Sequence, residues 1–140
     1  MKNLILAILI LLFSSSVASA TMINRGIDTL GNRLIYDQDL DITWYDFSNT
    51  SVTWDSQVAW AGGLSVDFGG DILDGWRLPT TVDGTYTFGD DGTTTAGYNI
   101  TTSEMGHLFY TELGNSQAEG MTNTGDFQNT LLSFYWTGTA

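Results

Sequence analysis

The stretch from Asp74 to Thr80, which reads Asp-Gly-Trp-Arg-Leu-Pro-Thr, constrains the fold of this chain more than any other segment. It contains the only proline, Pro79, which cannot donate a backbone hydrogen bond and pushes the residue before it toward extended geometry. Trp76 and Leu78 alternate with Arg77, so we expect a short strand that buries the two apolar residues on one face. In an acidic chain, Arg77 on the other face is expected to pair with a nearby carboxylate or with carbonyl oxygens rather than with a ligand.

The first twenty residues are typical of a secretory signal peptide. Lys2 precedes an apolar run from Leu4 to Phe13, and a segment of small residues ends in Ala18-Ser19-Ala20. As a helix, the apolar run would span only about 15 Å, which is about half of a bilayer core. An uncleaved membrane anchor is the alternative. We therefore expect cleavage after Ala20, export of the protein, and no membrane insertion of the mature chain.

Length, charge and cysteine content limit the classes of function. With 140 residues, the chain is long enough for one domain, which we place at residues 34–140, after the signal peptide (1–20) and a lead segment (21–33). Sixteen acidic residues against four basic ones give a net charge of −12, which disfavours binding to nucleic acid or anionic lipid. The chain has no cysteine, so disulfides, thiol chemistry and cysteine metal sites are excluded.

Local patterns in the first half predict a hairpin and a helix. Short apolar runs favour a β-hairpin over residues 33–45. Thr53 is expected to be the N-cap of a helix that stops at Gly62-Gly63. The expected apolar stripe of this helix consists of Trp54, Val58 and Ala61, widened by Trp60 and Leu64. Residues 66–75 are rich in glycine and aspartate and are expected to form a loop.

The second expected helix has the clearest boundary signals. Thr101 as N-cap with Glu104 three residues later forms a capping box, and Gly114 closes the helix. Gly106 in its interior costs roughly 1 kcal/mol relative to alanine, which indicates close packing at that position. The apolar face is expected to consist of Met105, Leu108, Phe109 and Leu113.

The remaining segments differ strongly in polarity. Residues 81–97 are the least core-like, although residues 85–92 have the composition of a small hairpin. Residues 131–137 are aromatic and predict a strand, which would need a partner to avoid an exposed edge. The tryptophans expected in the core are Trp44, Trp54, Trp76 and Trp136; helical spacing favours packing for Trp60 as well, although an exposed position would allow it to stack on sugars.

Three alternating aspartates, Asp37, Asp39 and Asp41, are the candidate ligands for calcium. Oxygen-rich turns suit Ca²⁺. The alternative is that these carboxylates accept hydrogen bonds from the backbone of their own turn. His107 is the only histidine and is expected on a helix surface, so no catalytic histidine arrangement can be assembled. We predict no catalytic residue and no cofactor other than possible calcium.

Several motifs, in this order along the chain, resemble the DUF1566 (Lcl C-terminal-like) domains of exported bacterial proteins. The motifs that carry the resemblance are Tyr36-Asp37, Thr43-Trp44, Thr53-Trp54, Trp76-Arg77-Leu78-Pro79-Thr80, Ser103-Glu104-Met105 and Tyr135-Trp136-Thr137-Gly138-Thr139. The resemblance implies an α+β fold of the C-type-lectin-like type, related to formylglycine-generating enzymes, with two helices and short antiparallel strands.

The resemblance also implies a location and a missing part. The form of residues 99–108 is similar to members with a PEP-CTERM sorting tail, which are exported to the envelope of exopolysaccharide-producing Gram-negative bacteria. Family members place closing strands after the segment that corresponds to Tyr135–Thr139, and this sequence lacks both those strands and the tail. On this basis we expect a truncated domain, located outside the cell or in the envelope.

Signal peptide, resemblance and the lack of a catalytic set together predict a secreted, non-catalytic binding module of the cell surface or extracellular matrix. Its expected partner is an exopolysaccharide or another cell-surface component. Two alternatives stay open. One is a purely structural envelope protein without a small ligand. The other is an enzyme related to the formylglycine-generating fold, which the missing cysteines disfavour.

Overall fold

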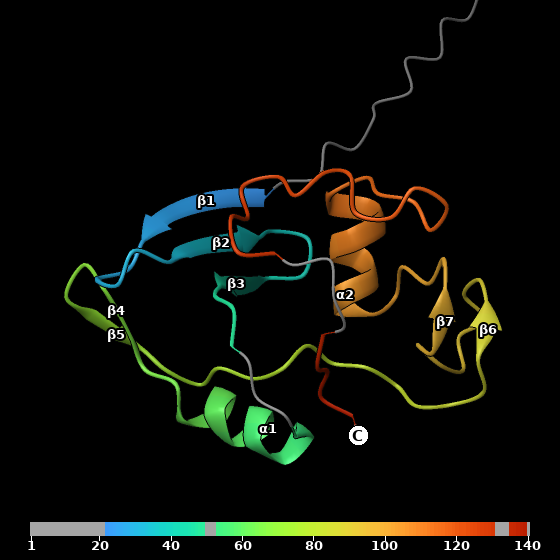
Figure 1. The fold of residues 1–140 in the computed structure, drawn as a ribbon, viewed down its shortest axis with the longest axis horizontal. Helices are drawn as coiled ribbons and strands as arrows, with labels where there is room; N and C mark the ends of the chain where they lie inside the picture. Colours follow the sequence, from blue (N-terminus) through green and yellow to red (C-terminus); the bar gives the residue numbers. More distant parts are fainter. Residues whose placement is uncertain (1–21, 50–52, 131–134, 140) are drawn as a thin grey trace, which may run out of the picture.

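Three antiparallel strands form the largest sheet of the computed structural model, which describes residues 22–49, 53–130 and 135–139. The architecture is α+β, with short helices and small, mainly antiparallel sheets, as expected (Figure 1). The predicted signal peptide and the first four residues of the predicted strand at 131–137 lie outside the described residues.

The predicted hairpin over residues 33–45 is confirmed. Strand β2 (Arg33–Asp37) pairs with β3 (Ile42–Asp46), and Ile35 lies opposite Trp44. An additional strand, β1 (Met22–Ile27), pairs with the other edge of β2, so the order is β1-β2-β3. The sequence predicted only a lead segment there. The structure shows why no apolar pattern marks this strand: it is half polar, and its side chains are mostly exposed.

Helix α1 (Trp54–Gly63) begins as predicted but turns a different face inward. The Thr53 hydroxyl accepts a hydrogen bond from the Ser56 amide at 3.3 Å, which confirms the N-cap. The buried residues are Gln57 and Ala61, however, and Val58 is 39% exposed, so the predicted stripe was wrong at Val58. A polar glutamine on the inner face cannot be recognised from an apolar pattern.

In the middle of the chain, the predicted secondary structure was wrong in two segments, residues 66–73 and residues 85–98. Strands β4 (Val66–Phe68) and β5 (Asp71–Leu73) form a hairpin where we expected a loop, and Gly69 and Gly70 between them both have positive φ. A Gly-Gly pair between apolar residues is a recognised hairpin signal. The small hairpin predicted over 85–92 is wrong. In the structure, β6 (Thr87–Phe88) instead makes a two-residue parallel pair with β7 (Gly97–Tyr98).

The segment from Asp74 to Thr80 is not a strand, because its backbone pairs with no neighbouring strand among the described residues. The predicted alternation of exposure is present: Trp76 and Leu78 are half-buried and Arg77 is exposed. The sequence therefore indicated the directions of the side chains but not the backbone pairing.

The second helix is shorter and differently capped than predicted. It consists of a single turn, α2 (Glu104–Gly106), which continues into a π-helix, η1 (His107–Glu112). The N-cap is Ser103, whose hydroxyl accepts a hydrogen bond from the Gly106 amide at 3.0 Å, so the predicted cap at Thr101 is wrong. The predicted apolar residue Leu108 is buried as expected.

The core lies between the sheet and this helix, which Figure 1 shows side by side. Its buried residues are Ile35, Leu108, Leu113 and Phe127, with Met22 and Trp44 packed against them. Trp136, which we expected in the core, is 43% exposed. Among the residues that the structure describes, no helix is long and apolar enough to cross a membrane.

The buried carboxylate of Asp46 connects the segment after η1 to the three-stranded sheet by hydrogen bonds. Asp46, at the end of β3, is 3% exposed and accepts hydrogen bonds from the amides of Gln128 and Asn129 at 2.7 and 3.0 Å. The Asn129 side chain returns a bond to the Asp46 carbonyl at 2.8 Å. These bonds hold the neighbouring Phe127 in the core, although Gln128 is 82 positions away from Asp46 in the sequence.

Asp46→Asn is expected to destabilise the protein by about 1 kcal/mol, since an amide group can accept only one of the two amide bonds. The amide protons of Gln128 and Asn129 should exchange faster with solvent than in the unmodified protein, which hydrogen-exchange mass spectrometry or NMR measures. Asp71→Asn removes the same charge at an exposed position and should leave both protons protected. Unchanged protection in Asp46→Asn would contradict this role.

Candidate functional site

A groove of about 820 Å³ lies among the described residues, and several aromatic side chains line it. Its size falls within the usual range for small-molecule sites. The aromatic side chains include a row of four stacked or tilted rings, which we call the aromatic row: Trp60 from α1, Phe47 just after β3, Tyr45 from β3, and Trp76. Leu108, Phe109 and Leu113 from the region of η1 face it, and Tyr135 and Trp136 also line the groove.

The rings of the aromatic row pack on one another in sequence. Phe47 stacks on Trp60 with ring centres 5.6 Å apart and on Tyr45 with ring centres 5.7 Å apart. Tyr45 contacts Trp76 at 5.4 Å with the rings tilted by 43°. Phe47, in the middle, is 43% exposed, so part of the row is accessible from the groove. Contacts of this kind keep the rings in fixed orientations.

Hydrogen bonds hold Tyr45 in place at its outer end. Its hydroxyl donates to Asp28 at 2.6 Å and accepts from the Asn32 side chain at 2.8 Å. Burial, together with the bond to Asp28, raises the pKa of Tyr45 to about 12, so the hydroxyl stays protonated at physiological pH. The ring is therefore a neutral, immobile part of the aromatic row.

A buried amide without a partner lies in the same groove. Gln57 from α1 is 3% exposed, and its side-chain oxygen accepts a hydrogen bond from Asn49 at 3.4 Å. Its amide nitrogen, Nε2, has no hydrogen-bond partner in the described part of the chain. An unsatisfied buried donor of this kind costs roughly 1–3 kcal/mol, and because the atom is fully buried it does not reach the surface of the groove.

Residues Trp76 to Pro79 line part of the groove, and this stretch and Thr80 are held by structural contacts. Arg77 makes a two-pronged ion pair with Glu104, at 2.8 and 2.6 Å, and Glu104 also accepts from the Thr80 amide at 2.8 Å. The bond from Arg77 holds the pKa of Glu104 below its ordinary value. The Pro79 carbonyl accepts from the Gly138 amide at 2.8 Å. The expected pairing of Arg77 with a carboxylate is confirmed.

The three candidate calcium ligands point to different partners. Asp37 is fully buried and accepts from the amides of Asp39 and Leu40, which is the backbone-capping alternative for this residue. Asp41 accepts from the Tyr36 hydroxyl at 2.6 Å. Asp39 is exposed, and its carboxylate lies 3.9 Å from His107. Calcium binding by these residues stays a prediction.

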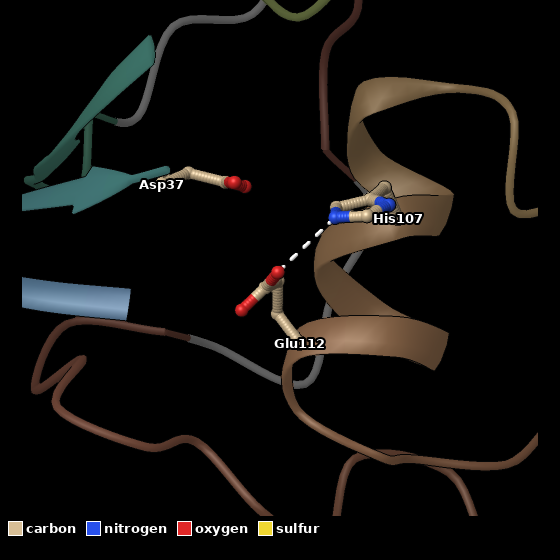
Figure 2. A group of neighbouring side chains, drawn as sticks. All are labelled: Asp37, His107 and Glu112. Carbon is tan, nitrogen blue, oxygen red and sulfur yellow. Dashed lines mark hydrogen bonds and ion pairs between the residues drawn. The ribbon is translucent and has the colours of Figure 1, made fainter. Parts of the chain in front are cut away.

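Asp37 instead belongs to a different cluster, which we call the Asp-His-Glu cluster: Asp37, His107 and Glu112 (Figure 2). One ligand atom from each residue lies within 4.8 Å of the others, and the Nε2 atom of His107 is 3.1 Å from Glu112. Within the described ranges, no other three histidine or acidic residues come this close. His107, expected on a helix surface, has a side chain that is only 17% exposed.

The π-helix explains why this cluster was missed. In an α-helix, residues five apart point about 140° away from each other. A π-helix closes its hydrogen bonds on the fifth residue, as the Leu113 amide does to the Leu108 carbonyl at 2.9 Å. His107 and Glu112 are therefore brought to the same face. Local widening of this kind leaves no signal in an apolar pattern, although π-turns often occur at functional sites.

Glu112 is the most unusual member of the cluster. Its side chain is 0% exposed, and its Oε2 atom has no hydrogen-bond partner within the described residues. Burial raises the pKa of Glu112, the bond from His107 opposes this, and the charge of Asp37 adds to the rise. The buried carboxylate of Glu112 is thus paired with His107, and the buried Asp37 lies close to both.

A scan against models of known protein families found no match. Searches for similar sequences among curated proteins and for similar folds among solved structures found none either. The resemblance to DUF1566 domains therefore stays a prediction, and the site has to be interpreted from its own geometry.

Proposed function

We propose that the protein is a secreted, non-catalytic binding module that holds a neutral glycan in the groove beside the aromatic row. The observation that carries the proposal is the row of stacked, partly exposed rings that lines the groove. Aromatic faces pack on the apolar faces of sugar rings.

The charge of the chain narrows the class of glycan. A net charge of −12 opposes the approach of acidic polysaccharides, so we expect a neutral chain from an exopolysaccharide or from the cell surface. The predicted export of the protein would bring it to such a partner. A fold of the C-type-lectin-like type, as the DUF1566 resemblance implies, is part of the same proposal.

Catalysis is not part of the proposal, which is based on the stacked rings; of the carboxylates that line the groove, Asp46 and Glu104 are engaged in structural hydrogen bonds. His107 and Glu112 are not among the residues that line it, whereas their neighbours Leu108 and Phe109 are. Arg77 and Glu104 are bonded to each other, and they also bond to the Leu78 carbonyl and the Thr80 amide, respectively.

Phe47→Ala is expected to weaken glycan binding about tenfold, which corresponds to about 1.4 kcal/mol, because it removes the central ring of the row. A glycan array would identify the ligand, and isothermal titration calorimetry would measure the affinity of the variant. Phe88→Ala is the matched control, since Phe88 is 72% exposed and lies outside the groove. Equal weakening by both variants would contradict a role for the aromatic row.

The array also separates the alternatives. Binding that is the same with and without added Ca²⁺ supports the groove. Binding that requires Ca²⁺ would favour the acidic turn with Asp37, Asp39 and Asp41 instead. An array without any bound glycan would favour the purely structural envelope protein.

A further inference from the structure

The Asp-His-Glu cluster has the composition and burial of a metal site. Its members come from the end of β2 and from both ends of η1, and Figure 2 shows their polar ends facing a shared space. We propose that Asp37, His107 and Glu112 bind one divalent transition-metal ion, with Zn²⁺ as the ion that the ligands fit best.

The distances are close to those that a metal ion requires. Zn²⁺ binds histidine nitrogen and carboxylate oxygen at about 2.1 Å, so ligands in a tetrahedral site lie about 3.4 Å apart. His107 Nε2 and Glu112 Oε1 are 3.1 Å apart, and no pair of ligand atoms in the cluster exceeds 4.8 Å. On binding an ion, the ligand atoms that lie farther apart would move toward this spacing.

Burial provides the second, independent argument. A buried carboxylate requires a partner of opposite charge, because desolvation of an isolated ion is very costly. The Glu112 side chain is fully buried with one oxygen unpartnered, and the only basic group that contacts it within the described residues is His107. A divalent ion would balance the negative charges of Asp37 and Glu112 together, and the unpartnered Glu112 oxygen could act as one of its ligands.

The ligand types favour a transition metal over calcium or magnesium. Imidazole nitrogen suits Zn²⁺ and its neighbours, whereas Ca²⁺ and Mg²⁺ prefer sites made only of oxygen. Asp39 lies 3.9 Å from His107 Nε2 and is 54% exposed, so it is placed to be a fourth ligand on the solvent side and to mark the entry path.

Asp37 is already oriented for this role by its surroundings. Its Oδ1 atom accepts from the amides of Asp39 and Leu40, while Oδ2 has only a long bond of 3.4 Å from the Trp44 indole. Oδ2 is thus available for an ion, and the turn fixes its direction, as second-sphere bonds do in known metal sites.

A metal ion here would link the β2–β3 hairpin to the helix across the core. The two parts are separated by about 70 residues in the sequence, and the chain has no cysteine to join them. The proposed ion thus stabilises the fold, and it lies apart from the glycan groove, whose lining includes none of the three ligands.

The test is calorimetric titration of chelator-treated, tag-free protein with ZnCl₂, with CaCl₂ and MgCl₂ as comparison ions. We expect one equivalent of Zn²⁺ to bind, an increase in Tm on addition of Zn²⁺, and little response to the other two ions. Glu112→Gln should weaken binding at least tenfold. Glu119→Gln, the same substitution at an exposed position, should bind as the unmodified protein does.

A direct readout keeps the test decisive if Glu112→Gln fails to fold. His107 is the only histidine, so its imidazole signals in the NMR spectrum of the unmodified protein can be assigned without ambiguity. Stoichiometric Zn²⁺ should shift them. Unshifted imidazole signals, an absence of one-to-one binding, a preference for Ca²⁺, or full affinity in a folded Glu112→Gln variant would each overturn the proposal.

Discussion

Gly106→Ala is expected to destabilise the protein by about 3 kcal/mol, although alanine is the better helix former by about 1 kcal/mol. A side-chain carbon at position 106 would collide with the Ile100 carbonyl oxygen and lie 2.8 Å from the Ser103 hydroxyl, the N-cap of α2. Ile100 is itself 2% exposed, so its backbone has no room to withdraw. The steric cost is therefore larger than the gain in helix propensity.

Urea denaturation monitored by tryptophan fluorescence measures this effect as a lower midpoint. Gly62→Ala is the matched control, because Gly62 also lies in a helix but its added carbon would meet nothing within 4 Å. That variant should be unchanged or more stable by up to about 1 kcal/mol. A Gly106→Ala protein as stable as Gly62→Ala would show that the close approach of Ile100 does not exist in solution.

The close packing at Gly106 was predicted from the sequence, whereas the register of the same helix was not. A glycine in an otherwise helical pattern is costly, so its presence indicated a neighbour that excludes a side chain. The capping box at Thr101 failed because Glu104 does not turn back to the cap. It binds Arg77 and Thr80 instead, in a segment more than 20 residues earlier. A tertiary contact thus overrode a local signal.

In the fold as a whole, too, elements defined by local sequence patterns were predictable, and elements defined by tertiary contacts were not. The β2–β3 hairpin and the start of α1 were predictable, since short-range apolar runs and the Thr53 cap define them. Strand β1 was missed because its contribution is backbone pairing to β2 rather than apolar burial. The parallel pair β6–β7 joins segments that carry no pattern of their own.

The candidate sites depend on even longer-range relations. Trp60 and Trp76 were considered only within their own segments, Phe47 was not singled out, and no local pattern places Phe47 between Tyr45 and Trp60. Asp37 was recognised as a possible metal ligand, but with Asp39 and Asp41 as its partners. His107 and Glu112 are brought together by a π-helix, and this departure from α-helical geometry could not be predicted from the sequence.

Several residues that carry the DUF1566 resemblance, from Trp54 onward, are linked to one another in space. Arg77 and Thr80 bind Glu104, and the Pro79 carbonyl binds the Gly138 amide. The Trp54 indole donates to the Thr137 carbonyl at 2.9 Å. This network joins both helices to the C-terminal segment, so these motifs are explained by a structural role and do not by themselves indicate a ligand.

Glu104→Gln is expected to remove about 2 kcal/mol of stability at pH 7, because the central acceptor of this network loses its charge. The effect should depend on pH. Arg77 lowers the pKa of Glu104 in the folded protein, so the carboxylate contributes stability above its ordinary pKa of 4.5. That contribution is lost as the pH falls through the lower pKa of the folded state. The difference in unfolding free energy between the two proteins should therefore shrink as the pH falls below about 4.5.

Urea denaturation of both proteins between pH 7 and pH 3 measures this difference directly. Taking the difference removes the contributions of other acidic groups, such as Asp28, whose pKa is also lowered because the bonds from Tyr45 and the turn outweigh burial. Glu119→Gln is the control, since Glu119 is exposed and bonded only to the nearby Ser116. Its effect should be small at every pH. If Glu104→Gln changed the free energy of unfolding at pH 7 as little as Glu119→Gln does, the ion pair with Arg77 would contribute nothing measurable to stability. The arrangement of Trp76 to Thr80 would then have to depend on the packing of its apolar side chains alone.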